Sequence, residues 1–212
     1  MIDSKKFTRD VFKAAQSPQL WLLSASRLRD GAEAILEKEL KYELPYIRAH
    51  KQAFGQATAN AYSDRNDAGT AEIKARVPNY PVAEMLYGYA LENLLKGIIV
   101  ANDPLLISDE KFNAKLKSHD LIQLSKTCEF ALNPQEIHVA KALSKLTEWA
   151  GRYPVALRQN EFAAGIPSRD ELLDYGSQHP TMRMLFNRCY SELERLLPKA
   201  IGSQYGVVVV FK

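Results

Sequence analysis

The stretch that decides the fold runs from Pro81 to Ala101 and reads PVAEMLYGYALENLLKGIIVA. A proline at its start favours the first turn of a helix, and Asp103-Pro104 closes it. Its apolar residues cover nearly the whole circumference of a helix rather than one side: Val82, Met85, Leu86, Tyr89, Leu91, Leu94, Leu95, Ile98 and Ile99. A helix that is apolar all round is buried, so this one should lie at the centre of the protein.

The segments on either side predict further helices with one apolar stripe each. They cover Lys6–Ala15, Gln19–Glu43, Leu121–Phe130, Gln135–Trp149 and Thr181–Ala200. In the first of them Phe7, Val11 and Phe12 should pack together, and Leu20, Leu40 and Met184 are expected among the buried positions of later ones. Short connections between such helices favour an antiparallel bundle, so the fold class is mainly α with four to five core helices.

A small β element is expected beside the bundle. Pro45 should end or kink the long helix, and residues 46–80 then form an insertion of less regular sequence. Within it, Thr70–Val77 alternates small or apolar with charged residues, as a half-exposed strand does. Its expected partner is the β-branched C-terminal run, residues 206–212. We therefore expect a single domain over residues 1–212, with an insertion and a two-stranded ribbon.

Composition excludes several classes. Of 212 residues, 28 are Lys or Arg and 25 are Asp or Glu, so the net charge of +3 argues against a dedicated nucleic-acid binder. Two cysteines, Cys128 and Cys189, are too few for a disulfide framework. The charged N-terminus lacks the apolar core of a signal peptide, and the longest apolar-rich stretch, Leu94–Ala101, is interrupted by Lys96. A cytoplasmic protein without a membrane partner is expected.

Common catalytic motifs are absent from the sequence. The histidines His50, His119, His138 and His179 stand far apart, without HExxH spacing, so no metal site is expected. Neither GxxxxGK[ST] nor GxGxxG occurs, which removes the usual phosphate-binding loops, and no cofactor is expected. The GxSxG elbow of serine hydrolases is missing too.

Polar residues on otherwise apolar helices are the remaining candidates for a site. Glu92 and Lys96 stand at i and i+4, where they either form an intrahelical salt bridge or line a ligand site. His119 and Asp120, at the start of a helix, either cap it or join that site. Arg152 follows a packed helix and could bind its last carbonyl groups or a phosphate. In the last helix, Arg183, Arg188 and Arg195 form a loose basic stripe or simply a solvated face.

Together these segments resemble the HEPN superfamily (higher eukaryotes and prokaryotes nucleotide-binding domain). The segments are Ser17-Pro-Gln-Leu-Trp, Tyr87-Gly-Tyr-Ala-Leu-Glu-Asn-Leu-Leu-Lys-Gly97, Ser118-His-Asp-Leu-Ile-Gln-Leu124 and Gly151-Arg-Tyr-Pro154. The resemblance spans about Ser17 to Pro154 and the closing helix, interrupted by the insertion. It implies a four- to five-helix bundle. We expect this bundle to form a homodimer with a pocket lined by Glu92, Lys96, His119 and Arg152, and Asp120 and Arg158 are further candidates for ligand binding.

Many HEPN proteins are metal-independent ribonucleases that carry Arg, four to six residues and then His. Here Arg152 is followed at those distances by Leu157, Arg158 and Gln159, and no histidine has an Arg at the required distance before it. The sequence thus favours a non-catalytic member that binds a nucleotide, RNA or a partner protein, for example a nucleotidyltransferase in a toxin–antitoxin or defence system. Two alternatives stay open: an atypical ribonuclease that uses His119, and a purely structural subunit that pairs through Val207–Phe211.

Overall fold

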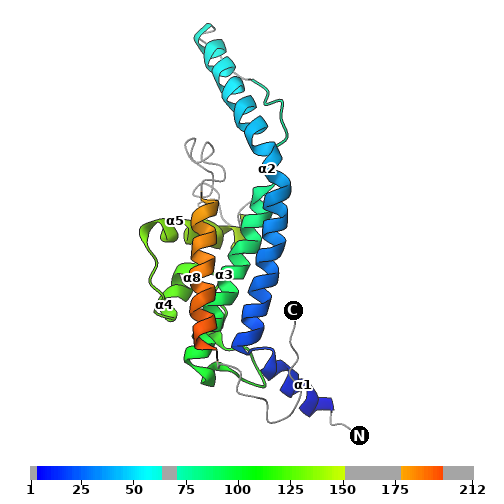
Figure 1. Ribbon diagram of the computed structural model, residues 1–212, viewed down its shortest axis with the longest axis vertical. Coiled ribbons are helices and arrows are strands. Elements are labelled where there is room, and N and C mark those ends of the chain that lie inside the picture. Colours follow the sequence, from blue (N-terminus) through cyan, green and yellow to red (C-terminus); the bar gives the residue numbers. More distant parts are fainter. Residues whose placement is uncertain (1–3, 64–70, 151–177, 198–212) are drawn as a thin grey trace.

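The computed structural model describes residues 4–63, 71–150 and 178–197, which are mainly helical (Figure 1). The helices are α1 (Ser4–Ala14), α2 (Pro18–Ser63), α3 (Tyr80–Asn102), α4 (Leu121–Thr127), α5 (Pro134–Lys145) and α8 (His179–Leu196). Two 3₁₀ turns, Pro104–Leu106 and Ala114–Leu116, lie between α3 and α4, and α5 continues into a π-helical turn at Leu146–Ala150. The prediction of a mainly α bundle is confirmed.

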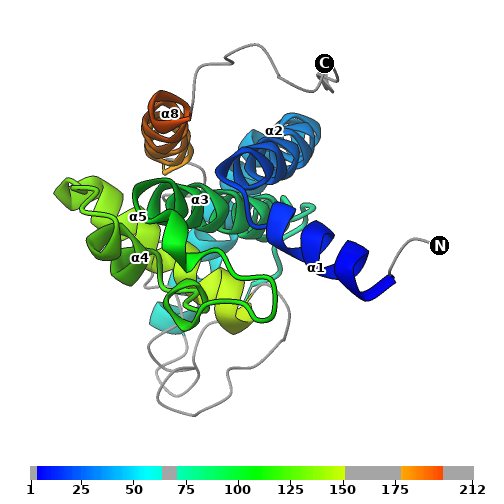
Figure 2. The same ribbon diagram turned by 90° about the horizontal axis from the view of Figure 1, so that it is seen from below.

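Helix α3 is the centre of the bundle, as its all-round apolar sequence predicts. Seen along the helices, it is surrounded by α2, α8, α5 and α4 (Figure 2). Fourteen of its 23 residues are buried, including the polar pair Glu92 and Lys96. Helices α2 and α3 are antiparallel, whereas α8 runs in the same direction as α3 (Figure 1). The surrounding helices therefore leave α3 little contact with water.

Helix α2 does not end at Pro45. It continues to Ser63, so residues 46–63 of the expected irregular insertion are helical, and the alternative that Pro45 terminates the helix is wrong. Figure 1 shows α2 changing direction about halfway along its length, as expected where a proline removes a backbone hydrogen bond. Contacts on both sides of Pro45 offset that loss: the hydroxyl of Tyr80 donates to Glu43 at 2.5 Å, and Tyr46 is buried.

The residues that lead from α2 to α3 do not form the expected strand. Among the described residues no strand occurs, and residues 71–79 form neither helix nor strand. The reason lies in Glu39 on α2, which accepts hydrogen bonds from the Arg76 guanidinium at 2.7 Å and from the backbone amide of Asn79 at 3.0 Å. The segment is thus held by a side chain of α2, and residues 206–212, its expected partner, lie outside the described residues.

Several apolar residues expected in the core are at the surface. The buried seam of α2 is formed by residues spaced seven, four, three, seven and seven apart: Ala25, Ala32, Leu36, Glu39, Tyr46 and Ala53. Leu40 lies beside this seam and is 62% exposed, and Leu20 is exposed as well. Met184 is 56% exposed because α8 buries Leu185 and Phe186 instead. Phe7 and Val11 of α1 are also exposed.

Two glycines allow neighbouring helices to approach α3 closely. A Cβ atom added at Gly88 would lie 2.6 Å from Thr147 Cγ2 and 3.2 Å from the carbonyl oxygen of Leu143, whereas one added at Gly97 would lie 2.6 Å from Leu193 Cδ2 and 3.0 Å from Trp21 Cβ. The two 2.6 Å distances are shorter than real Cβ atoms show, and those of 3.0 and 3.2 Å are tighter than most real Cβ contacts. The absence of a side chain at both positions is therefore part of the packing of α3.

We predict that Gly88→Ala and Gly97→Ala each lower the free energy of unfolding by about 1–3 kcal/mol, because the added methyl group forces helices apart. The matched control is Gly55→Ala in α2, where no atom lies within 4 Å of the added Cβ. That change should stabilise the helix by about 0.5–1 kcal/mol through the better helix propensity of alanine. Urea unfolding followed by circular dichroism measures all three. Equal effects at the three positions would contradict the packing role of Gly88 and Gly97.

Candidate functional site

Among the described residues, the most deeply buried ionic contact joins Glu92 and Lys96 within α3. The ammonium Nζ of Lys96 donates to Glu92 Oε1 at 2.6 Å, and the two side chains are 7% (Glu92) and 5% (Lys96) exposed. The predicted i to i+4 salt bridge is confirmed. Buried charges need such pairing because leaving one of them alone in the interior is costly.

His119 joins this pair from outside α3. Its Nδ1 lies 2.9 Å from Glu92 Oε2, so each oxygen of the carboxylate has one cationic or imidazole partner. Because a carboxylate only accepts hydrogen bonds, Nδ1 is the donor, and in the neutral ring Nε2 is then an acceptor. The His119 side chain is 49% exposed, unlike Glu92 and Lys96. Within the described residues, His119 is thus where the buried Glu92–Lys96 pair reaches the surface.

Local interactions around α4 explain why His119 is held in this position. Asp120 caps α4, since its Oδ1 accepts from the backbone amides of Ile122 at 2.8 Å and Gln123 at 3.2 Å. The hydroxyl of Ser118 accepts from the amide of Asp120 at 3.1 Å. The next amide, that of Leu121, donates to Ser144 Oγ of α5 at 3.0 Å. Asp120 therefore acts as the cap that was one of its two predicted roles, and these bonds fix the backbone next to His119.

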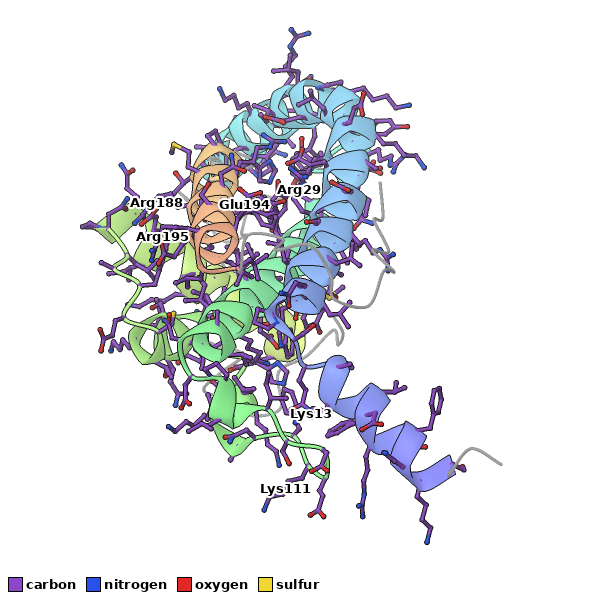
Figure 3. All side chains as sticks on the ribbon, turned by 60° about the horizontal axis from the view of Figure 1, so that its bottom comes forward. Lys13, Arg29, Lys111, Arg188, Glu194 and Arg195 are labelled. Atoms are coloured by element: carbon purple, nitrogen blue, oxygen red, sulfur yellow. The ribbon has the colours of Figure 1, made fainter. Side chains whose placement is uncertain are left out.

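The remaining predicted site residues stand apart from this cluster. Arg152 and Arg158 lie outside the described residues. The arginines of α8 each bind a carboxylate: Arg183 binds Glu33, Arg188 binds Glu136 and Arg195 binds Glu192. Arg188 also donates to the carbonyl of Ala131 at 3.1 Å. Figure 3 shows Arg188 and Arg195 beside α8. The three side chains are 44% (Arg183), 47% (Arg188) and 66% (Arg195) exposed, so they lie on a solvated face, and each is paired with a carboxylate rather than forming a free basic stripe.

A second polar cluster, which the sequence analysis missed, connects α2, α3 and α8. The hydroxyl of buried Tyr87 donates to Glu33 Oε1, and Arg183 donates to both oxygens of Glu33 at 2.7 and 2.8 Å. The hydrogen bond from Arg183 lowers the pKa of Glu33, while burial raises the pKa of Tyr87. Residues 33, 87 and 183 are too far apart in sequence for any spacing rule to find them. The cluster ties three helices together and offers no exposed nucleophile.

The cysteines are buried and free. Burial raises the pKa of Cys128 to about 11 and also raises that of Cys189. Since the thiolate is the reactive form, neither residue is suited to nucleophilic chemistry at neutral pH. The described residues contain no group of three or more His, Cys, Asp or Glu side chains that could hold a metal ion.

No family model, curated protein or solved structure matches this chain. In the described part of the chain, no helix combines the length and apolar character required to cross a membrane.

The chemistry available at the Glu92–Lys96–His119 cluster is that of one imidazole, which is oriented by a buried carboxylate and half exposed to solvent.

We predict that Lys96→Met lowers the free energy of unfolding by about 3–5 kcal/mol, because it leaves the Glu92 carboxylate buried without its ammonium partner. The double variant Glu92→Leu with Lys96→Met removes both charges and should recover most of this loss. Lys126→Met, on the exposed side of α4, serves as the control for the substitution itself. Urea unfolding measures each variant. If Lys96→Met is no less stable than Lys126→Met, the pair is not the buried ion pair described.

Glu33 predicts a specific pH dependence of stability. Its pKa in the folded protein lies below its ordinary value of 4.5, so the stabilisation is present above that value and is lost as the pH falls through the lower, folded pKa. We expect Glu33→Gln to be less stable at neutral pH and to lose less stability than the wild type below pH 4.5. Thermal unfolding over a pH series tests this. Glu37→Gln, one turn further along α2 and exposed, should retain the wild-type profile; identical profiles for both variants would refute the expectation.

Proposed function

We propose that this chain is a non-catalytic, HEPN-like helical module that binds a phosphate-bearing ligand, either a nucleotide or the backbone of RNA, at His119. The homodimer, the partner protein such as a nucleotidyltransferase, and the toxin–antitoxin or defence setting belong to the same proposal. They rest on the sequence resemblance alone.

The observation that supports binding at His119 is its fixed orientation. Glu92 holds Nδ1 at 2.9 Å, and the bonds of Ser118 and Asp120 fix the backbone beside it. An imidazole held in this way loses little conformational freedom when it contacts a ligand, which favours binding. Protonation of the ring would give it two donors, one for Glu92 and one for a phosphate oxygen.

We propose no catalysis because the other described candidates, Glu92 and Lys96, are already bound to partners within the protein. Cleavage of RNA without a metal requires a base for the 2′-hydroxyl group together with groups that stabilise phosphate charge and protonate the leaving oxygen. Lys96 is buried and donates to Glu92, and both oxygens of Glu92 have partners. The Arg-to-His spacing of the nucleases is missing from the sequence as well.

A second candidate is the atypical ribonuclease, because a carboxylate behind a half-exposed imidazole is also the arrangement that positions a general base. In that case His119 Nε2 would accept the proton of the ribose hydroxyl. The structural subunit remains the third alternative, and its pairing segment, Val207–Phe211, lies outside the described residues.

We predict that His119→Ala weakens binding of short RNA or of a nucleoside triphosphate about tenfold, since a charge-assisted hydrogen bond to phosphate contributes about 1.5–3 kcal/mol. The matched control is His138→Ala on α5, an exposed histidine that contacts Gln178 at 3.1 Å and lies outside the Glu92 cluster. Fluorescence or calorimetric titration of wild type and both variants provides the comparison. Unchanged binding in His119→Ala would contradict the binding proposal.

The wild type, His119→Ala and His138→Ala also distinguish the binding module from the ribonuclease. Each is incubated with total RNA in the presence of a chelator, and the products are separated by electrophoresis. No cleavage by the wild type supports the binding module and removes the ribonuclease. Cleavage by the wild type and by His138→Ala, but not by His119→Ala, would overturn the non-catalytic proposal.

A further inference from the structure

Helix α1 differs from every other described helix because it buries none of its residues. Phe7 is 61% exposed and Val11 is 51% exposed. Figures 1, 2 and 3 all show α1 pointing away from the bundle, with Lys13 near the end closest to the body of the protein in Figure 3. Among the described residues, these two large apolar side chains therefore form an exposed apolar surface on a projecting helix.

The helix is nevertheless held in a defined place at its C-terminal end. Directly after α1, the buried side chain of Gln16 donates to the carbonyl of Ser108 at 2.7 Å and to that of Phe12 at 3.0 Å. The indole of Trp21 donates to the carbonyl of Gln16 at 3.1 Å. The exposed surface of α1 is therefore presented from a fixed attachment point.

The two sides of α1 have opposite character. Phe7, Val11 and Ala14 stand at i, i+4 and i+7 and form one narrow stripe. Lys6, Arg9 and Lys13 lie on the other side of the helix. Helices that have one apolar side and one basic side bind at the boundary between the headgroups and the acyl chains of a bilayer.

The net charge of the chain is concentrated in this helix. Helix α1 contains four basic residues and one acidic residue, an excess of three positive charges over 11 residues. The whole chain of 212 residues has a net charge of +3, so the positive and negative charges of all the other residues cancel. A surface with this excess is complementary to an anionic one.

We propose that α1 docks on an anionic phospholipid bilayer, with Phe7 and Val11 inserted among the headgroups and the Lys and Arg side chains on the lipid phosphates. A nucleic acid would satisfy the charges but not the apolar stripe. A helix-binding groove of a protein is less favoured, because such grooves take large anchors at i, i+4 and i+7 and the third position here is Ala14. An 11-residue helix is too short to span a bilayer, so the contact is peripheral and departs from the expectation of no membrane partner.

The test is co-sedimentation of the full chain with vesicles of phosphatidylcholine alone and of phosphatidylcholine mixed with phosphatidylserine. The wild type should sediment with the mixed vesicles at low salt, and high salt should release it. Phe7→Ser with Val11→Ser removes the stripe and keeps the charge, whereas Lys6→Glu with Arg9→Glu reverses charge and keeps the stripe. Each pair should lower the partition coefficient about tenfold or more. None of these residues is buried, so the variants should fold.

Matched controls carry the same types of change elsewhere on the surface. Leu105→Ser alters an apolar residue that is 93% exposed, and Lys111→Glu with Lys115→Glu reverses two exposed lysines. These variants should sediment like the wild type. No sedimentation of the wild type with mixed vesicles, or loss that is equal in the controls, overturns the proposal. So does a fall in solution mass on light scattering of Phe7→Ser with Val11→Ser, since α1 would then be a contact between two copies of the chain.

Discussion

The carboxylate of Glu92 is the point on which the arrangement of the central helix depends. The stretch of α3 around Glu92 is enclosed by neighbouring elements, so a charged group there is kept from solvent and must be paired inside the protein. Lys96 neutralises it within the helix, and His119 uses its second oxygen from another segment. One buried group thus stabilises α3 and fixes the residue next to the start of α4. Replacing the pair by apolar residues would keep the helix buried but would release His119.

Carboxylates connect elements elsewhere in the bundle in the same way. Glu33 of α2 binds α3 and α8, Glu39 holds the segment before α3, and Glu136 both caps α5 and binds Arg188 of α8. Each of these glutamates accepts from at least two donors on other elements or at a helix end. As a consequence, the guanidinium groups of Arg183 and Arg188 are bound to carboxylates of the protein itself. Outside α1, basic and acidic residues are equal in number, so the rest of the chain has no net positive charge with which to attract a polyanion over a long distance.

The sequence predicts what depends on local patterns. Burial of α3 follows from its all-round apolar pattern, the Glu92–Lys96 bond from their spacing of four, and the cap at Asp120 from its place before α4. Contacts over long separations are not predictable in this way: Glu92 and His119 are 27 residues apart, and no local pattern shows that His119 Nδ1 contacts the Glu92 carboxylate. The continuation of α2 past Pro45 was missed because tertiary contacts of Glu43 and Tyr46 offset a local preference. The prediction that Phe7 and Val11 are packed was wrong for a related reason. An amphipathic pattern shows that one face of a helix is apolar, but it does not show what covers that face.

Charge balance at His119 constrains what could bind there. The buried pair behind the ring is neutral overall, since one carboxylate faces one ammonium, and the residue that follows His119 in the sequence is the exposed, acidic Asp120. Two backbone amides at Asp120 Oδ1 offset part of that negative charge. A lone imidazole beside a carboxylate is a weak phosphate site, so strong binding requires a second cation near the ring.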